Sequence, residues 1–144
     1  MSKVTESFVY TSLAIILGAV AIVSYWLAWP YEPYSGPYSD QLLLVGETRI
    51  FHAGDKVTYR IVGTHNTTGM YAMVSTQLVD GIVIQYPARA YLTKAGPHDF
   101  TITHELPEFL DPGKYSIQSF TAIQVNPLRA ITLRRATDEF LVVP

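Results

Sequence analysis

The stretch "KVTYRIV", residues 56–62, decides the fold. Its apolar residues Val57, Tyr59 and Ile61 alternate with polar ones. Successive side chains of a β-strand point to opposite faces of a sheet, so this alternation is typical of a strand with one face buried. The stretch therefore predicts a sheet that packs one of its faces into a core.

Similar segments fill the chain beyond residue 41, and each is bounded by Gly, Pro, Asn or Asp. They are "MYAMVSTQLV" (70–79), "IVIQYPARAYL" (82–92), "HDFTITHEL" (98–106), "KYSIQSFTAIQV" (114–125), "RAITLRR" (129–135) and "EFLVV" (139–143). About seven or eight short strands of this kind predict an all-β domain, an immunoglobulin-like antiparallel β-sandwich. We expect it to occupy residues 42–144.

A local pattern supports this fold class. In "LDPGKY", residues 110–115, a Pro-Gly turn precedes Tyr115 near the start of a strand. Immunoglobulin-like domains place a tyrosine corner here, with the hydroxyl bonded to the upstream backbone. An ordinary half-buried tyrosine is the alternative for Tyr115.

The segment before the β domain is apolar. Residues 8–29 contain no charged side chain. About 20 apolar residues in a helix cross a bilayer, and bulky residues stand where a signal peptidase needs small ones. We expect a retained transmembrane helix over 8–29. Aromatic side chains collect at the headgroup level, which predicts a membrane-interface belt: Tyr25, Trp26, Trp29 and Tyr31.

The flanking charges suggest an orientation. Lys3 lies before the span, and no Lys or Arg follows it until Arg49. Because basic residues favour the cytoplasmic side, we expect residues 1–7 in the cytoplasm and the β domain outside it, in a periplasm or on a virion membrane. The repeated Pro-Tyr pairs of residues 30–41 predict an extended linker between the two.

Composition excludes several functions. The chain has 144 residues, a net charge of −2, scattered basic residues and no cysteine. We therefore expect no nucleic-acid partner and no disulfide, thiolate chemistry or copper site of the cupredoxin kind. The chain contains neither a nucleophile elbow nor a nucleotide-binding glycine motif. We predict no cofactor, no catalytic residue and no enzymatic activity.

Histidines are the best candidates for a metal site. His98 and His104 would lie on one face of a strand, but about 20 Å apart at about 3.3 Å per residue. One ion would need further ligands from other strands, such as His52 or His65. We expect instead that His98 and His104 flank an inward face, and we predict no metal.

Two charged groups are interpreted as solvated surface. Glu105, Glu108 and Asp111 lie in a Pro-rich loop, where a turn explains them as well as a hydrolase would. The arginines of the 129–135 segment are its densest basic cluster, and alternation places Ile131 and Leu133 inward and Arg134 outward. A solvated strand face is favoured over an anion or headgroup site formed by Arg129, Arg134 and Arg135.

The Asp80-Gly81 pair predicts a two-residue hairpin turn. Such a turn would pair Val79 with Ile82 and Leu78 with Val83, which leaves apolar side chains on both faces of the hairpin. One face, together with outward Phe120, would remain exposed, as protein interfaces often do. The predicted interface therefore consists of Leu78, Val79, Ile82, Val83 and Phe120; a longer turn would leave a single buried face.

The order of these motifs resembles small membrane-anchored proteins of tailed bacteriophages and prophages. The resemblance rests on the single span followed by "LVDGIVIQYP", "LPEFLDPGKY", "VNPLR" and "TDEFLVV". Members of that group often carry a cysteine pair that is missing here. The resemblance implies a phage or bacterial setting and supplies no catalytic residues.

Two functions follow as expectations. The first is a membrane-anchored extracytoplasmic module that binds or assembles with another protein. The second is a structural subunit of a larger membrane complex, held by its helix, in which Ala14, Gly18 and Ala21 form a small-residue strip. Either function allows the chain to oligomerise.

Overall fold

The computed structural model describes residues 3–80 and 82–144, without the side chain of Ile82. This part of the chain contains one helix and eleven strands. They are α1 (Lys3–Ala28), β1 (Tyr34–Ser35), β2 (Leu43–Leu44), β3 (Ile50–His52), β4 (Lys56–His65), β5 (Tyr71–Asp80), β6 (Ile82–Gln85), β7 (Arg89–Leu92), β8 (Gly96–Glu105), β9 (Gly113–Asn126), β10 (Arg129–Ala136) and β11 (Phe140–Val143).

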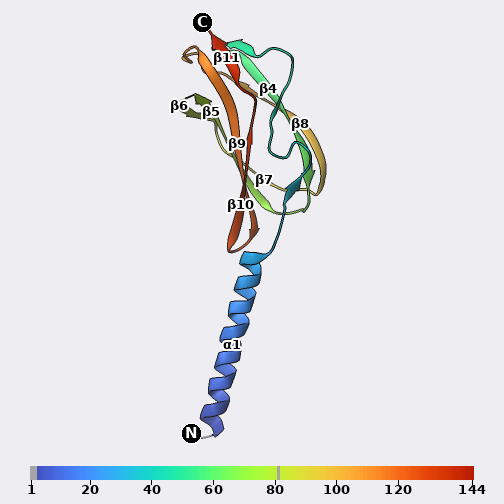
Figure 1. Cartoon of the computed structure of the whole chain (residues 1–144), viewed down its shortest axis with the longest axis vertical. Coiled ribbons are helices and arrows are strands. Elements are labelled where there is room, and N and C mark those ends of the chain that lie inside the picture. The colour runs from blue at the N-terminus through green and yellow to red at the C-terminus, as the bar shows by residue number, and fades with distance from the viewer. Residues whose placement is uncertain (1–2, 81) are drawn as a thin grey trace. The chain divides into compact units, whose positions relative to one another are not determined.

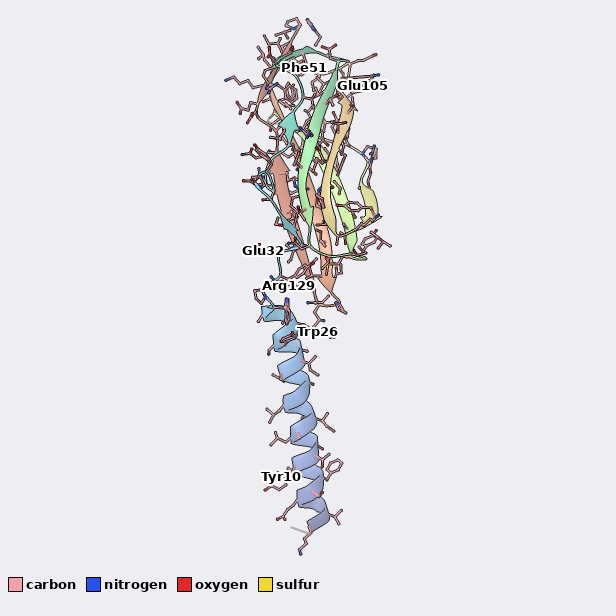
Figure 2. All side chains as sticks on the ribbon, turned by 90° about the vertical axis from the view of Figure 1, so that its right-hand side faces the viewer. Tyr10, Trp26, Glu32, Phe51, Glu105 and Arg129 are labelled. Carbon is pink, nitrogen blue, oxygen red and sulfur yellow. The ribbon has the colours of Figure 1, made fainter. Side chains whose placement is uncertain are left out.

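The chain forms two compact units. One consists of α1 up to Tyr31 and the turn Asn126–Arg129, and the other holds Glu32–Val125 and Ala130–Pro144. The side chains of α1 project on all sides of its axis (Figure 2) and none of its described residues is buried. At about 1.5 Å per residue, its 26 residues measure about 39 Å. The helix is therefore long and apolar enough to cross a membrane.

The second unit consists of two sheets (Figure 1). In the first, β4 pairs along its whole length with β8, and its other edge pairs with β1 and β2. In the second, β9 pairs with β5 on one side and with β10 and β11 on the other. Strand β5 continues this sheet to β6 and β7. The fold is thus β-rich, as the sequence predicts.

One pair of strands departs from the predicted antiparallel arrangement. Strand β11 pairs antiparallel with β9 but parallel with β3, so the second sheet is mixed. A parallel pair needs a long crossover, and here β4 to β10 lie between the two strands in sequence. The pattern of residues 50–52 is too short to reveal such a partner.

The core lies between the two sheets. Val57, Tyr59 and Ile61 are buried there, which confirms the face that alternation assigns to them. The second sheet adds several buried side chains, among them Leu78, Ile117 and Phe140. Because both sheets supply one continuous cluster, their packing holds the unit together.

Tyr115 forms the predicted corner. Its side chain is buried, and its hydroxyl donates a hydrogen bond of 2.7 Å to the carbonyl oxygen of Asp111. Burial raises the pKa of this hydroxyl, and the nearby carboxylates of Asp80 and Asp111 act in the same direction. The phenol therefore stays protonated as a donor at neutral pH.

The β5–β6 hairpin has a different register from the predicted one. Asp80 pairs with Ile82, Val79 with Val83 and Leu78 with Ile84. One residue, Gly81, separates the paired positions instead of two, and Gly81 itself lies outside the described residues. The shift moves each partner by one position, so a different set of side chains shares each face.

Two further segments depart from the predictions. The run 82–92 forms two strands instead of one, because Pro87 lacks the backbone N–H that a continuous ladder needs. The predicted linker 30–41 is partly folded. Tyr34 and Ser35 pair with β4, and the Tyr34 side chain is buried. The second unit thus begins at Glu32 rather than at Leu42.

Candidate functional site

A cavity of about 340 Å³ lies between the two sheets. One wall consists of β4 and β8, and the other of β5, β7, β9 and β10. Apolar side chains contribute to both walls: Ile61, Val74, Leu92, Phe100 and Ile102. We call this space the inter-sheet cavity.

Small inward side chains create the space. Along β9 the buried positions run from Tyr115 and Ile117 to Ser119 and Thr121. Thr76 faces them from β5, and all three hydroxyl residues line the cavity. Side chains of this size do not fill the distance of about 10 Å between packed sheets. The cavity thus follows from a change of residue size along one strand.

The charges that line the cavity have one sign. Three basic residues and three histidines contribute to its walls: His65, Arg89, Lys94, His98, His104 and Arg135. Among the described residues, no Asp or Glu lines it. The whole chain, by contrast, has twelve acidic residues, ten basic ones and a net charge of −2. The excess of basic residues is therefore specific to the cavity and does not reflect the composition of the chain.

Arg135 is the most unusual member. It is only 4% exposed, and its guanidinium lies 4.0 Å from the centre of the Tyr34 ring. Its Nε donates to the carbonyl oxygen of Ser39 at 3.0 Å, and Nη1 approaches the hydroxyl of Thr121 at 3.4 Å. In the described chain, no carboxylate lies within ion-pair distance of Arg135. A buried charge without an opposite partner costs several kcal/mol, which stacking offsets only in part.

The burial of Arg135 corrects the prediction for the arginine cluster. Arg134 is exposed as expected, and it bonds to Gln118 at 3.0 Å. Arg135 has the same parity as Ile131 and Leu133, so alternation already places it on the inward face. The sequence prediction grouped the two neighbouring arginines as one surface cluster and therefore missed the inward position of Arg135.

Tyr34 reaches this region because residue 63 is glycine. A Cβ atom on Gly63 would overlap the Tyr34 ring, so the glycine leaves the space that the ring occupies. The Tyr34 hydroxyl lies 2.9 Å from Nε2 of His98. Burial raises the pKa of this phenol, although Arg135 acts in the opposite direction. Tyr34 therefore links Arg135 to the histidines.

His65 and His98 form a close pair. Their ring centres are 4.6 Å apart, and the buried Nδ1 atom of each lacks a hydrogen-bond partner in the described protein. Burial lowers the pKa of His98 to about 4, and the charges of His65 and Arg135 add to the effect. Burial and Arg135 also lower the pKa of His65. Both rings are neutral at pH 7, and each keeps one buried ring nitrogen without a protein partner.

His104 lies in a second aromatic group. Its Nε2 is 3.1 Å from the Tyr59 hydroxyl, and its ring stacks on Tyr86 with centres 4.2 Å apart. Burial and the charge of Arg89 lower its pKa. Burial raises the pKa of Tyr59 to about 12, so this hydroxyl stays protonated. Arg89 is exposed, and so is Lys94, which makes these two the accessible cations of the cavity.

The histidines considered for a metal site lie in three places. His98 meets His65, His104 meets Tyr59, and His52 lies 3.6 Å from Asp55 near the surface. Within residues 3–80 and 82–144, no three His, Cys, Asp or Glu side chains gather as metal ligands would. Of the two histidines that the sequence offers as partners from other strands, His52 and His65, it is His65 that contacts His98.

The predicted interface residues are divided between two faces. Leu78 is fully buried in the core, so it is withdrawn from the interface. Val79 and its partner Val83 lie on the outer face, and Val83 is 58% exposed. Phe120 is partly exposed beneath Arg134, whose guanidinium is 5.8 Å from its ring centre. The side chain of Ile82 lies outside the described residues.

The predicted membrane belt lies around the last turn of α1. The rings of Tyr25 and Trp29 make an edge contact with centres 4.6 Å apart, and both are exposed. Trp26 is exposed and Tyr31 partly so. Arg129 donates hydrogen bonds to the carbonyl oxygens of Leu27 and Trp29 at 3.2 and 2.6 Å. A cation is favourable at a helix C-terminus, where carbonyl groups lack helical partners.

No known protein family and no curated protein matches this chain. Several solved structures are similar at low scores. A family 123 glycoside hydrolase from Clostridium perfringens shares 14% identity over 65% of this chain and 22% of its own, with a TM-score of 0.40. Neutral ceramidase from Pseudomonas aeruginosa shares 17% over 76% and 21%, with a TM-score of 0.43.

The sporulation control protein Spo0M from Bacillus subtilis shares 12% identity over 73% of this chain and 49% of its own, with a TM-score of 0.35. This chain thus spans about a fifth of the two enzymes and about half of Spo0M. At these scores the three likenesses carry no conclusion about fold or function. The resemblance to phage proteins stays a prediction.

Proposed function

We propose that this chain is a membrane-anchored module whose β domain binds a small ligand in the inter-sheet cavity. The observation that carries the proposal is the cavity itself. Ligand sites have volumes of about 300–1,000 Å³, mostly apolar walls and a few convergent polar groups, often with shifted pKa values. The inter-sheet cavity has a volume of about 340 Å³ and combines apolar walls with His65, His98 and Arg135.

The proposal includes the finer form of the fold. Two packed sheets and the Tyr115 corner support an immunoglobulin-like sandwich. Such a domain presents many kinds of site, so its architecture by itself assigns no activity. The argument for binding therefore rests on the cavity residues.

The proposal also keeps α1 as a permanent anchor, with its N-terminus in the cytoplasm and the β domain outside. The uncharged stretch of α1, the aromatic residues at its end and the position of Lys3 support this topology. Protease added to spheroplasts should then digest the β domain and leave α1 protected. A protected β domain, or a mature chain that begins near residue 30, would contradict the topology.

A pair of variants tests binding in the cavity. Val74→Phe adds bulk to a wall residue, whereas Met73→Phe introduces the same side chain on the opposite face of β5, where residue 73 is 47% exposed. Calorimetric titration of the full-length protein in detergent with small aromatic ligands should give binding that Val74→Phe abolishes and Met73→Phe preserves. The proposal fails if no ligand binds, or if both variants bind like the parent.

A protein partner is the second candidate function. The outer face of the second sheet carries exposed apolar side chains at Tyr71, Met73 and Val83, which favours contact with another protein. Cross-linking in native membranes tests this candidate. Partners captured through the β domain favour a binding or assembly module, and partners captured only through α1 favour a structural subunit.

A further inference from the structure

We infer that the ligand of the inter-sheet cavity is an amphipathic organic anion, whose acidic group lies at Arg135 and whose apolar body lies along β8. This inference rests on the proposed function and specifies the chemical class of its ligand. Arg135 would hold the acidic group, and the neutral rings of His65 and His98 would lie beside it. Phe100 and Ile102 would contact the apolar body.

The first argument is charge. Arg135 is buried, carries a permanent positive charge and has no carboxylate partner in the described part of the protein. A guanidinium matches the two oxygens of a carboxylate, phosphate or sulfonate, and burial strengthens that interaction. An anionic ligand would supply the missing counter-charge. A neutral or cationic ligand would leave the charge uncompensated.

The second argument is the unpaired nitrogens. His65 and His98 each have a buried Nδ1 atom without a partner. When the Tyr34 hydroxyl donates to Nε2 of His98, the neutral tautomer places its proton on Nδ1. Nδ1 then becomes a donor next to Arg135. A buried donor without a partner, close to a fixed cation, favours an acceptor with negative charge.

The third argument is the apolar wall. Phe100 and Ile102 follow His98 on the inward face of β8, and Val74 contributes from the opposite sheet. These side chains offer an inorganic anion nothing to bind. An organic anion would bury apolar surface against them, at roughly 25 cal/mol for each Å² removed from water. The ligand class therefore combines one acidic group with an apolar body.

The test compares two ligands of one shape. 2-Naphthoate carries a carboxylate and 2-naphthamide a neutral amide on the same ring system. We expect the full-length protein to bind 2-naphthoate at least tenfold more tightly in calorimetric titrations at pH 7, with empty micelles as the blank. Acetate should bind at least tenfold more weakly than 2-naphthoate, because it lacks the apolar body.

Two neighbouring arginines provide a matched pair of variants. Arg135→Gln should reduce the affinity for 2-naphthoate to that for 2-naphthamide and leave 2-naphthamide binding unchanged. Arg134→Gln removes the same charge from the outer face of the same strand and should change neither affinity. If Arg135→Gln does not fold, Arg135→Lys replaces it: 2-naphthoate should bind several-fold more weakly, because lysine lacks the planar fork.

The outcomes separate the inference from the proposed function. Equal binding of 2-naphthoate and 2-naphthamide overturns the anionic class and leaves a binding cavity. Equal binding of acetate and 2-naphthoate overturns the amphipathic class. A preference for 2-naphthoate that Val74→Phe does not weaken, or that Arg134→Gln weakens as much as Arg135→Gln, places the anion elsewhere and overturns the inference. If neither naphthalene ligand binds, the proposed function fails as well.

Discussion

The packed core and the inter-sheet cavity lie between the same two sheets, yet their linings differ. Around the core, Ile117 on β9 meets Leu78 on β5 and Val57 on β4, all of them fully buried. Around the cavity, β9 presents Ser119 and Thr121 at the same kind of inward position. The core stabilises the domain by burying apolar surface, whereas the cavity keeps space and charge at a cost in stability.

The difference shows how one strand can serve two purposes. Alternation fixes which side chains point inward, but their size and polarity decide whether that interior is filled. The cavity needs both sheets to be held apart by the core next to it. Substitutions in the core, in the cavity and on the outer face should therefore differ in their effect on stability.

Leu78→Ala should have the largest effect. Leu78 is fully buried within the core cluster, so its truncation leaves a void. We expect a loss of about 2–5 kcal/mol in the free energy of unfolding. Urea denaturation of the full-length protein, followed by circular dichroism of the strand signal, measures it. A loss below about 1 kcal/mol would show that this part of the core is loosely packed.

Gly63→Ala should have the next largest effect. The added methyl group overlaps Tyr34, so the ring must move away from His98 and Arg135. We expect a loss of about 1–3 kcal/mol from this overpacking. The same urea titration measures it. Gly46→Ala is a control for space, because a methyl group there meets no neighbour, although its positive φ adds backbone strain. Equal unfolding energies for Gly63→Ala and the parent would contradict the Tyr34 contact.

The pH dependence of stability tests the buried histidines. Unfolded histidines titrate near pH 6.5, and burial lowers the pKa of His98 to about 4, so the unfolded state takes up protons first as the pH falls. The melting temperature should decrease between pH 6.5 and pH 4.5. One such group gives a slope of at most about 1.4 kcal/mol per pH unit, reduced by solvent screening.

A single variant isolates the contribution of His98. His98→Gln should flatten the decrease. The neighbours Asp99, His65 and Arg135 also bear on the titration, and Asp99 favours the protonated imidazole. A parent protein whose melting temperature stays constant over this range would refute the lowered pKa.

Tyr115→Phe should cost about 1 kcal/mol, the contribution of one hydrogen bond. It removes the bond to the Asp111 carbonyl and leaves the ring in place. Tyr71→Phe, on an exposed tyrosine of β5, should change the free energy of unfolding much less. If the two variants are equally stable, the corner does not contribute to stability.

Val83→Lys should have the smallest effect, within about 0.5 kcal/mol, because the Val83 side chain is exposed on the outer face. The same urea titration compares it with Leu78→Ala. Together the two variants separate the faces of the β5–β6 hairpin. Unfolding of the Val83→Lys protein would mean that this face is buried.

Much of the fold could be predicted from alternation and turn residues. The inward faces of β4 and β9 follow the period of two, and the Pro-Gly turn before Tyr115 marks its corner. The short strands β1 to β3 could not be predicted, because two or three residues carry no period. The register of the β5–β6 hairpin could not be predicted either, because a turn motif does not fix which residues pair.

The site could be predicted only in part. Sequence reasoning offers His52 or His65 as a partner of His98 only for a metal site that it predicts to be absent, and the β4–β8 register brings His65 to His98. The role of Tyr34 depends on the absence of a side chain at Gly63, a contact between distant positions that a single sequence does not reveal. Arg135 shows the opposite case, because the alternation of its strand already places it on the inward face.

Strand β1 has a mechanical consequence. Only residues 29–33 separate α1 from Tyr34, so tension that α1 transmits along the backbone would reach this two-residue strand before any other strand. Pulling would peel β1 from its two pairs with β4 and draw the Tyr34 ring away from Gly63, His98 and Arg135. Force applied through α1 would thus loosen the cavity lining while Leu78 and Ile117 stayed packed.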